Sequence, residues 1–230
     1  MRSYSPRQER RALAKFTTQQ RLLVVAPGLD LQLLEIVDPY SLLDRMVEQE
    51  AQNKRVERYP YWAELWPTSF GLAHWFCRTG VAPPGGWTRE LGCGLGLVGI
   101  SLALLGWRVE ASDFIEDALI FAHCNARRNG VAHRHRVSYL DWRNPVGAPG
   151  SCMVASDVVY EKQNHPYLRR LLRDLLEPGG TFYLGDPGRP LAAPFIGDLQ
   201  RLGYDHRAEQ CTFDWQGRST TIDIHILQKP

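Results

Sequence analysis

ELGCGLGLVG, residues 90–99, places four glycines directly after a short run that we expect to be a strand. Glycines allow a backbone to approach a bound ligand closely. The N-terminus of a helix that begins in such a loop offers free N–H groups to a carboxylate or a phosphate. The stretch therefore predicts a strand, a ligand-binding loop and a helix, and it leaves open whether the ligand is a dinucleotide or something smaller.

After residue 80, runs typical of strands alternate with runs typical of helices. We expect a strand that ends at Glu90–Leu91, and further strands at 107–113, 135–142, 151–160 and 181–186. Helices are expected at 97–106, 114–130 and 165–180. This alternation predicts an α/β fold with a parallel sheet. Two last strands, 204–215 and 219–229, flank QGR with no helix between them, which indicates an antiparallel C-terminal hairpin.

The first 80 residues are expected to be mostly helical. LDLQLLEIVDPYSLLDRMVEQE, residues 29–50, carries apolar residues at helical spacing, interrupted by Pro39, with Asp38 as a candidate cap. An aromatic segment follows at 59–76, and APPGG at 82–86 marks a boundary. We therefore expect an N-terminal helical extension with an aromatic segment over 1–80 and the α/β domain over 81–230.

Composition excludes several classes of protein. The net charge is +2, and no basic stripe accompanies the aromatic segment, so we expect no nucleic-acid partner. No apolar run approaches the length of a membrane span. Five scattered cysteines favour buried thiols in a reducing compartment over disulfides or zinc, and His133-x-His135 lacks the further ligands of a metal site. We expect a cytoplasmic protein if the source is bacterial and a mitochondrial matrix protein if it is eukaryotic.

The glycine loop fits two kinds of cofactor. Gly94-x-Gly96-x-x-Gly99 satisfies the dinucleotide fingerprint, and Asp113, at the end of the second strand, is placed to bind ribose hydroxyls. Glu90 precedes Gly92 and completes E-x-G-x-G-x-G, a pattern associated with S-adenosylmethionine. Its carboxylate would meet the ammonium of an amino-acid moiety, which NAD lacks. No second half is present to bind nicotinamide, so we favour S-adenosylmethionine.

The remaining candidates follow the third and fourth strands, because ligands of an open parallel sheet bind at the carboxyl ends of its strands. Asp141 and Trp142 are expected at the adenine, where the alternative is a capping Asp and a core Trp. Ser156 is expected to line the cofactor site. Asp157 and Tyr160 are expected to orient an amine nucleophile and to exclude water, where the alternative is a turn cap and a packing residue.

These residues resemble a known family, the seven-β-strand (class I) protein-lysine methyltransferases grouped as methyltransferase family 16. Asp157-x-x-Tyr160 looks like the family's D-x-x-Y motif, Leu140–Asp141–Trp142 like its adenine motif, and YWAELWP, with Trp66, like its segment before the glycine loop. The resemblance covers roughly residues 55–190. It implies a Rossmann-like seven-stranded sheet, S-adenosylmethionine as cofactor, a cofactor contact for Trp66 and a lysine site at Asp157 and Tyr160.

One branch of the family is particularly similar. GDPGRP, residues 185–190, looks like a segment of the electron-transfer flavoprotein β-subunit lysine methyltransferases, and it implies a place for Asp186 or Arg189 beside the lysine site. The sequence thus predicts a protein-lysine N-methyltransferase with a protein substrate. Two alternatives remain open. They are a small-molecule N- or O-methyltransferase on the same fold and an inactive cofactor-binding scaffold.

Overall fold

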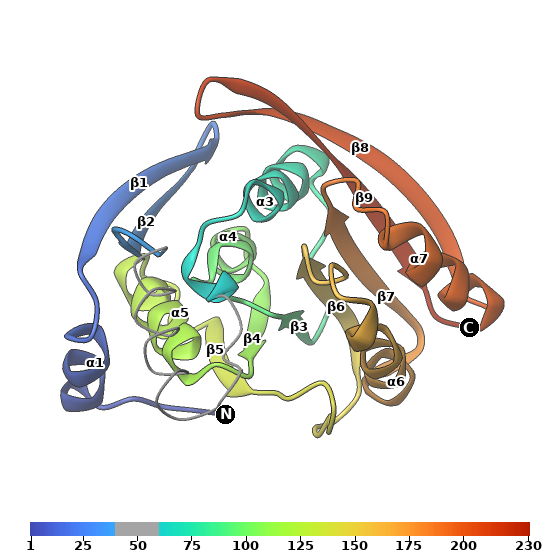
Figure 1. Ribbon diagram of the computed structural model, residues 1–230, viewed down its shortest axis with the longest axis horizontal. Coiled ribbons are helices and arrows are strands. Elements are labelled where there is room, and N and C mark those ends of the chain that lie inside the picture. The colour runs from blue at the N-terminus through green and yellow to red at the C-terminus, as the bar shows by residue number, and fades with distance from the viewer. Residues whose placement is uncertain (40–59) are drawn as a thin grey trace, which may run out of the picture.

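A seven-stranded sheet forms the centre of the protein (Figure 1). The computed structural model describes residues 1–39 and 60–230. The sheet has the order β5-β4-β3-β6-β7-β9-β8. Its strands are β3 (Trp87–Leu91), β4 (Arg108–Asp113), β5 (His135–Tyr139), β6 (Gly150–Ser156), β7 (Leu176–Asp186), β8 (Asp205–Trp215) and β9 (Arg218–Gln228). The first five are parallel, and β9 is antiparallel to both of its neighbours. The predicted sheet and its C-terminal hairpin are confirmed.

Helices cover both faces of the sheet. One face carries α3 (Pro67–Thr79), α4 (Leu97–Leu104) and α5 (Glu116–Arg128), and the other carries α6 (His165–Leu175) and α7 (Ala192–Arg201) (Figure 1). Alternate residues of β6 belong to these two layers. Val154 packs with α3 and α4, whereas Met153 and Ala155 pack with α6 and α7. No helix among the described residues is long and apolar enough to cross a membrane.

The predicted boundaries needed small corrections. The third and fourth strands end at Tyr139 and Ser156, so the candidate site residues that follow them lie in loops. The helix that we expect Pro178 and the glycines after it to close ends at Leu175, and β7 begins at once at Leu176, earlier than the expected residue 181. Helix α7 was not among the expected elements.

The helical prediction for residues 29–36 is wrong. After a short helix α1 (Pro6–Leu13), the chain forms an antiparallel hairpin of β1 (Thr18–Ala26) and β2 (Leu29–Ile36). Gly28 adopts a φ of 82° in the turn between them. Leu29, Leu31 and Leu33 are buried while the residues between them are exposed, which is the period of a strand. Leu29, Leu33 and Ile36 have helical spacing as well, and pairing with β1 decides between the two.

The rest of the predicted helix, from residue 40 to residue 50, lies outside the described residues. Farther on, the aromatic segment forms a short 3₁₀ turn, η1 (Tyr61–Ala63), and then α3, which ends at Gly80 with a φ of 62°. Leu31 and Leu33 of β2 share one hydrophobic core with Phe76 of α3 and Val154 of the sheet. The N-terminal hairpin is thus packed onto α3 and the seven-stranded sheet.

Asn125 of α5 ties this hairpin to the glycine loop. Its buried side-chain amide accepts a hydrogen bond from Leu34 N at 2.7 Å and donates to Leu34 O at 3.1 Å and to Leu95 O at 3.0 Å. A buried backbone group that loses its partner costs about 1–3 kcal/mol. One side chain therefore satisfies three backbone groups of two segments that are far apart in the sequence.

We expect Asn125→Ala to lower the free energy of unfolding by about 3 kcal/mol, because it leaves those three groups without their partner. Urea denaturation measures the change. Asn129→Ala is the matched control, since Asn129 bonds Gln32 N and Gln32 O in the same manner in a more exposed place. Its expected cost is about 1 kcal/mol. Equal losses in the two variants would contradict the role given to Asn125.

Candidate active site

The glycine loop turns the chain between β3 and α4 through left-handed backbone geometry. The φ angles of Gly92, Gly94 and Gly96 are 67°, 50° and 88°. A Cβ at Gly94 would lie 3.1 Å from the carbonyl oxygen of Trp62, and a Cβ at Gly96 would lie 3.0 Å from the Cβ of Ala122. Other residues are strained in such geometry and would be crowded here. The glycines are therefore required by both the turn and its packing.

Asp113 holds this loop from the end of β4. Its Oδ2 accepts a hydrogen bond from Gly94 N at 3.2 Å, and its Oδ1 accepts one from Ile115 N at 3.0 Å. Burial raises the pKa of Asp113 to about 6, although these backbone N–H groups favour the charged form. The carboxylate that the sequence assigns to ribose hydroxyls thus also braces the loop.

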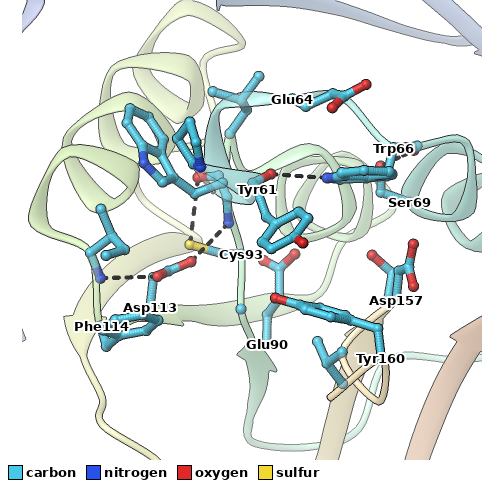
Figure 2. A pocket seen from close by; sticks show the side chains of 18 of the residues that line it. Tyr61, Glu64, Trp66, Ser69, Glu90, Cys93, Asp113, Phe114, Asp157 and Tyr160 are labelled. Atoms are coloured by element: carbon cyan, nitrogen blue, oxygen red, sulfur yellow. Dashed lines mark hydrogen bonds between the residues drawn. The ribbon is translucent and has the colours of Figure 1, made fainter. Parts of the chain in front are cut away.

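Glu90 is buried at the end of β3 and has no hydrogen-bond partner for its Oε2 within the described part of the chain. In Figure 2 its carboxylate lies between Asp113 and Asp157 and points into the cavity. Burial raises the pKa of Glu90 from its usual 4.5 to about 8, an effect that the backbone N–H of Gly99 partly offsets. A buried carboxyl group with an unused oxygen suits a ligand that brings an ammonium group.

Asp141 and Trp142 lie just after β5, and both line the cavity beside the glycine loop. A Cβ at Gly92 would lie 3.5 Å from the indole of Trp142, so this ring packs closely against the loop. Asp141 makes an ion pair of 2.6 Å with Arg143, and this pairing lowers its pKa. Ser156 ends β6 and lines the same cavity.

Asp157 and Tyr160 follow β6. Asp157 is only 8 % exposed and has a φ of 55°, which is unusual for a residue other than glycine. Its backbone N–H donates to Gly185 O at 2.9 Å. Both of its carboxylate oxygens accept hydrogen bonds from the guanidinium of Arg189. That guanidinium also lies 5.5 Å from the ring centre of Tyr160.

Aromatic side chains form the wall above Asp157 and Tyr160. The ring of Tyr61 lies 5.0 Å from that of Tyr160 and 6.0 Å from that of Trp66 (Figure 2). Trp66 precedes α3 as its N-cap residue and donates its indole N–H to Tyr61 O at 2.9 Å. The aromatic segment before the glycine loop therefore covers the end of the site that holds Asp157 and Tyr160.

A single cavity of about 1330 Å³ joins these groups. It is lined by all the predicted site residues except Gly96, namely Trp66, Glu90, Gly92, Gly94, Asp113, Asp141, Trp142, Ser156, Asp157 and Tyr160. Gly96 instead packs against α5 through Ala122. Of the two residues that the branch resemblance brings in, Arg189 lines the cavity and Asp186 is fully buried beside it.

The sequence analysis missed several lining residues, among them Phe114, Tyr61 and Lys15. Phe114 follows Asp113, lines the cavity and is 47 % exposed, and an aromatic residue directly after a strand-ending acid was the available signal. Tyr61 was quoted within the aromatic segment but was given no role. Lys15 reaches the cavity from the N-terminal segment and makes an ion pair of 2.7 Å with Asp117. No local pattern marks Lys15, because its place depends on the packing of α1 against α5.

The strand order and the glycine-loop cavity define a class I methyltransferase fold. Among solved structures, the chain is similar to the glycopeptide N-methyltransferase MtfA with sinefungin, with 17% identity, a TM-score of 0.58 and coverage of 73% of this chain and 89% of that one. It is also similar to magnesium protoporphyrin IX methyltransferase from Synechocystis PCC 6803 with bound SAM, with 16% identity, a TM-score of 0.56 and coverage of 70% and 78%.

The chain belongs to the lysine methyltransferase family, whose model matches residues 62–191. Among curated proteins, mouse "EEF1A lysine methyltransferase 3" is 33% identical over 133 residues, which are 55% of this chain and 56% of that protein. The chain thus spans about half the length of this relative. The resemblance to methyltransferase family 16 is confirmed, whereas the electron-transfer flavoprotein branch stays a prediction.

S-adenosylmethionine is the cofactor of this family. The residues present fit it, because the cavity is lined by the buried carboxyl group of Glu90, which suits an ammonium group, and by a glycine loop, which suits the backbone of an amino acid. When bound, it supplies a methyl group on a positively charged sulfur. Glu90, Asp113 and Trp142 are the residues that we expect to hold its amino group, its ribose and its adenine.

Glu90→Gln should weaken binding of S-adenosylhomocysteine at least tenfold, because the amide cannot pair with the ammonium group. The same variant should also differ from the parent in how its stability depends on pH. A carboxyl group whose folded pKa is raised contributes stability below its unfolded pKa, near 4.5, and this contribution is lost as pH rises through 8. The variant should therefore match the parent at pH 4 and exceed its Tm by about 5 °C at pH 9.

Calorimetric titration and thermal unfolding at several pH values measure both effects. Glu110→Gln is the control on the next strand, where Glu110 pairs with Arg136 at 2.6 Å and has a lowered pKa. It should lower the Tm at neutral pH and leave S-adenosylhomocysteine binding unchanged. If Glu90→Gln bound S-adenosylhomocysteine as tightly as the parent, the assignment of Glu90 would be wrong.

Proposed function

We propose that this protein is an S-adenosylmethionine-dependent protein-lysine N-methyltransferase in which Asp157 and Tyr160 receive the substrate lysine. One observation carries the proposal. A single cavity joins the glycine loop to a buried carboxylate walled by Tyr61 and Tyr160, within the stretch that matches the family. Its volume of about 1330 Å³ exceeds the ~300–1,000 Å³ of common ligand pockets, which leaves room for an acceptor side chain beside the cofactor.

The chemistry explains why these residue types suit a lysine. The ε-ammonium group of the bound lysine first releases a proton to water. The lone pair of the resulting neutral amine then forms the new N–C bond, the electrons of the C–S bond stay on sulfur, and the methylated nitrogen carries the positive charge. The carboxylate of Asp157 would stabilise the charge that develops on nitrogen. The rings of Tyr61 and Tyr160 would enclose the aliphatic part of the lysine and exclude water.

The β-subunit of electron-transfer flavoprotein is our candidate substrate. Support comes from residues 185–190, GDPGRP, which resemble that branch of the family and which contribute Arg189 to the acceptor end of the cavity. The curated relative is named for EEF1A, so a translation elongation factor is the second protein to test. Both are protein substrates, in contrast to the small-molecule alternative.

The test uses radiolabelled S-adenosylmethionine with the purified protein and a lysate of its source, separated into protein and small-molecule fractions. We expect label on a protein band of the mass of an electron-transfer flavoprotein β-subunit, and mass spectrometry then locates the lysine. Label on an elongation factor would keep the reaction and replace the substrate. Label confined to small molecules would overturn the proposal in favour of a metabolite methyltransferase, and no label at all would favour a binding scaffold.

Asp157→Asn tests the role of the acceptor carboxylate. Asparagine tolerates the left-handed geometry of this position, so the backbone should be preserved. We expect kcat/KM for the protein substrate to fall at least 100-fold, while the Kd of S-adenosylhomocysteine stays within threefold of the parent value. Asp174→Asn on the exposed face of α6 is the matched control and should change neither quantity. Full activity of Asp157→Asn would contradict the assignment.

A further inference from the structure

The acceptor carboxylate already holds a cation from this chain. Arg189 donates from Nη2 to Asp157 Oδ2 at 2.8 Å and from Nε to Asp157 Oδ1, which is the two-pronged geometry that arginine makes with carboxylates. The same guanidinium lies 5.5 Å from the ring centre of Tyr160. A carboxylate and an aromatic face together are the groups that bind organic cations. Arg189 thus uses both groups that a lysine ammonium would need.

The backbone that carries Arg189 is fixed. Asp186 is fully buried at the end of β7, and its Oδ1 accepts hydrogen bonds from Gly188 N at 2.8 Å and from Arg189 N at 2.7 Å. Strand β7 is in turn registered on β6, where Ser156 pairs with Gly185. Because the backbone is anchored, Asp157 is uncovered by rotation of the Arg189 side chain alone.

The two partners differ in exposure in the way that such a rotation requires. The side chain of Asp157 is 6 % exposed, whereas that of Arg189 is 34 % exposed. An arginine can place its guanidinium in water by changing rotamers, but a buried carboxylate that is left without a positive partner is strongly destabilising. A cation that leaves Asp157 must therefore be replaced by another one.

We propose that Arg189 determines acceptor specificity by exchange: it pairs with Asp157 until the ammonium group of a lysine displaces it. This inference rests on the proposed function, because it takes Asp157 as the lysine site. A neutral side chain cannot displace Arg189, since Asp157 would then lose its positive partner. A long cationic side chain can, because it replaces both the ion pair with Asp157 and the contact with Tyr160.

The first test needs no turnover and uses n-butylammonium as a lysine side-chain probe, titrated by NMR in the presence of S-adenosylhomocysteine. Arg189→Ala removes the internal competitor, so we expect the probe to bind at least tenfold more tightly to this variant than to the parent. n-Butanol, the neutral control, should gain nothing. The double variant Arg189→Ala/Asp157→Asn should lose the gain. Equal affinity of parent and Arg189→Ala for n-butylammonium would overturn the inference.

Arg189→Lys provides the same test in a variant that keeps the charge pair, in case Arg189→Ala fails to fold. Lysine makes a point contact rather than a two-pronged one. It should compete less well than arginine, with a gain of about threefold for the probe. An Arg189→Lys protein that binds n-butylammonium no more tightly than the parent would likewise contradict exchange.

A second test separates exchange from a bracing role of Arg189. Under exchange, Arg189→Ala lowers KM for the methylated protein, and added guanidinium chloride inhibits this variant competitively at concentrations that leave the parent active. If Arg189 only braces Asp157, kcat falls without a drop in KM, and guanidinium restores activity instead of inhibiting. Failure of the proposed function is recognised separately, because it shows as absent protein methylation in the parent and does not affect the n-butylammonium titration.

Discussion

The left-handed path of the chain from Gly92 to Gly96 is the constraint on which the site depends. It ends β3, starts α4 and brings Gly94 N to the carboxylate of Asp113. The same turn lies so close to the carbonyl oxygen of Trp62 that a side chain at Gly94 would collide with it. The loop therefore fixes the covering aromatic segment as well as the floor of the cavity, and both parts of the site depend on residues without a Cβ.

Strand order then brings two buried carboxyl groups into one cavity. β3 and β6 are neighbours, and the crossovers leave them in opposite directions, so Glu90 and Asp157 emerge at the same switch point of the sheet. Ionisation costs free energy at both positions, because a buried charge loses its hydration. The two carboxyl groups differ in how this cost is offset. Glu90 has a pKa raised to about 8, which favours its neutral form, whereas Asp157 accepts two hydrogen bonds from the guanidinium of Arg189. The cofactor end is thus ready to ionise when an ammonium group arrives, while the acceptor end is ready to exchange one cation for another.

Much of this arrangement was predictable from local patterns. The five parallel strands, the C-terminal hairpin and the lining residues at strand ends follow from periodicity and turn residues. The β1–β2 hairpin was missed because Leu29 and Leu33 fit the strand period with Leu31 and the helix period with Ile36, and only pairing with β1 selects the strand. The contact of Arg189 with Asp157 spans 32 residues and exists because β7 lies beside β6, so no spacing in the sequence could give it. The pairing of Asp141 with Arg143, two residues away, was within reach of a local pattern and was overlooked.

The exchange at Asp157 also bears on how a methylated product leaves. Methylation enlarges a lysine ε-amine without removing its ability to carry a positive charge, so the product is as suitable a partner for a buried carboxylate as the substrate was. A site that held the cation only through Asp157 and Tyr160 would retain its product. Arg189, anchored by Asp186, stays close enough to reclaim the carboxylate when the product moves out. The same internal cation that restricts access to the site would then favour release, because Asp157 is never left unpaired on either side of the reaction.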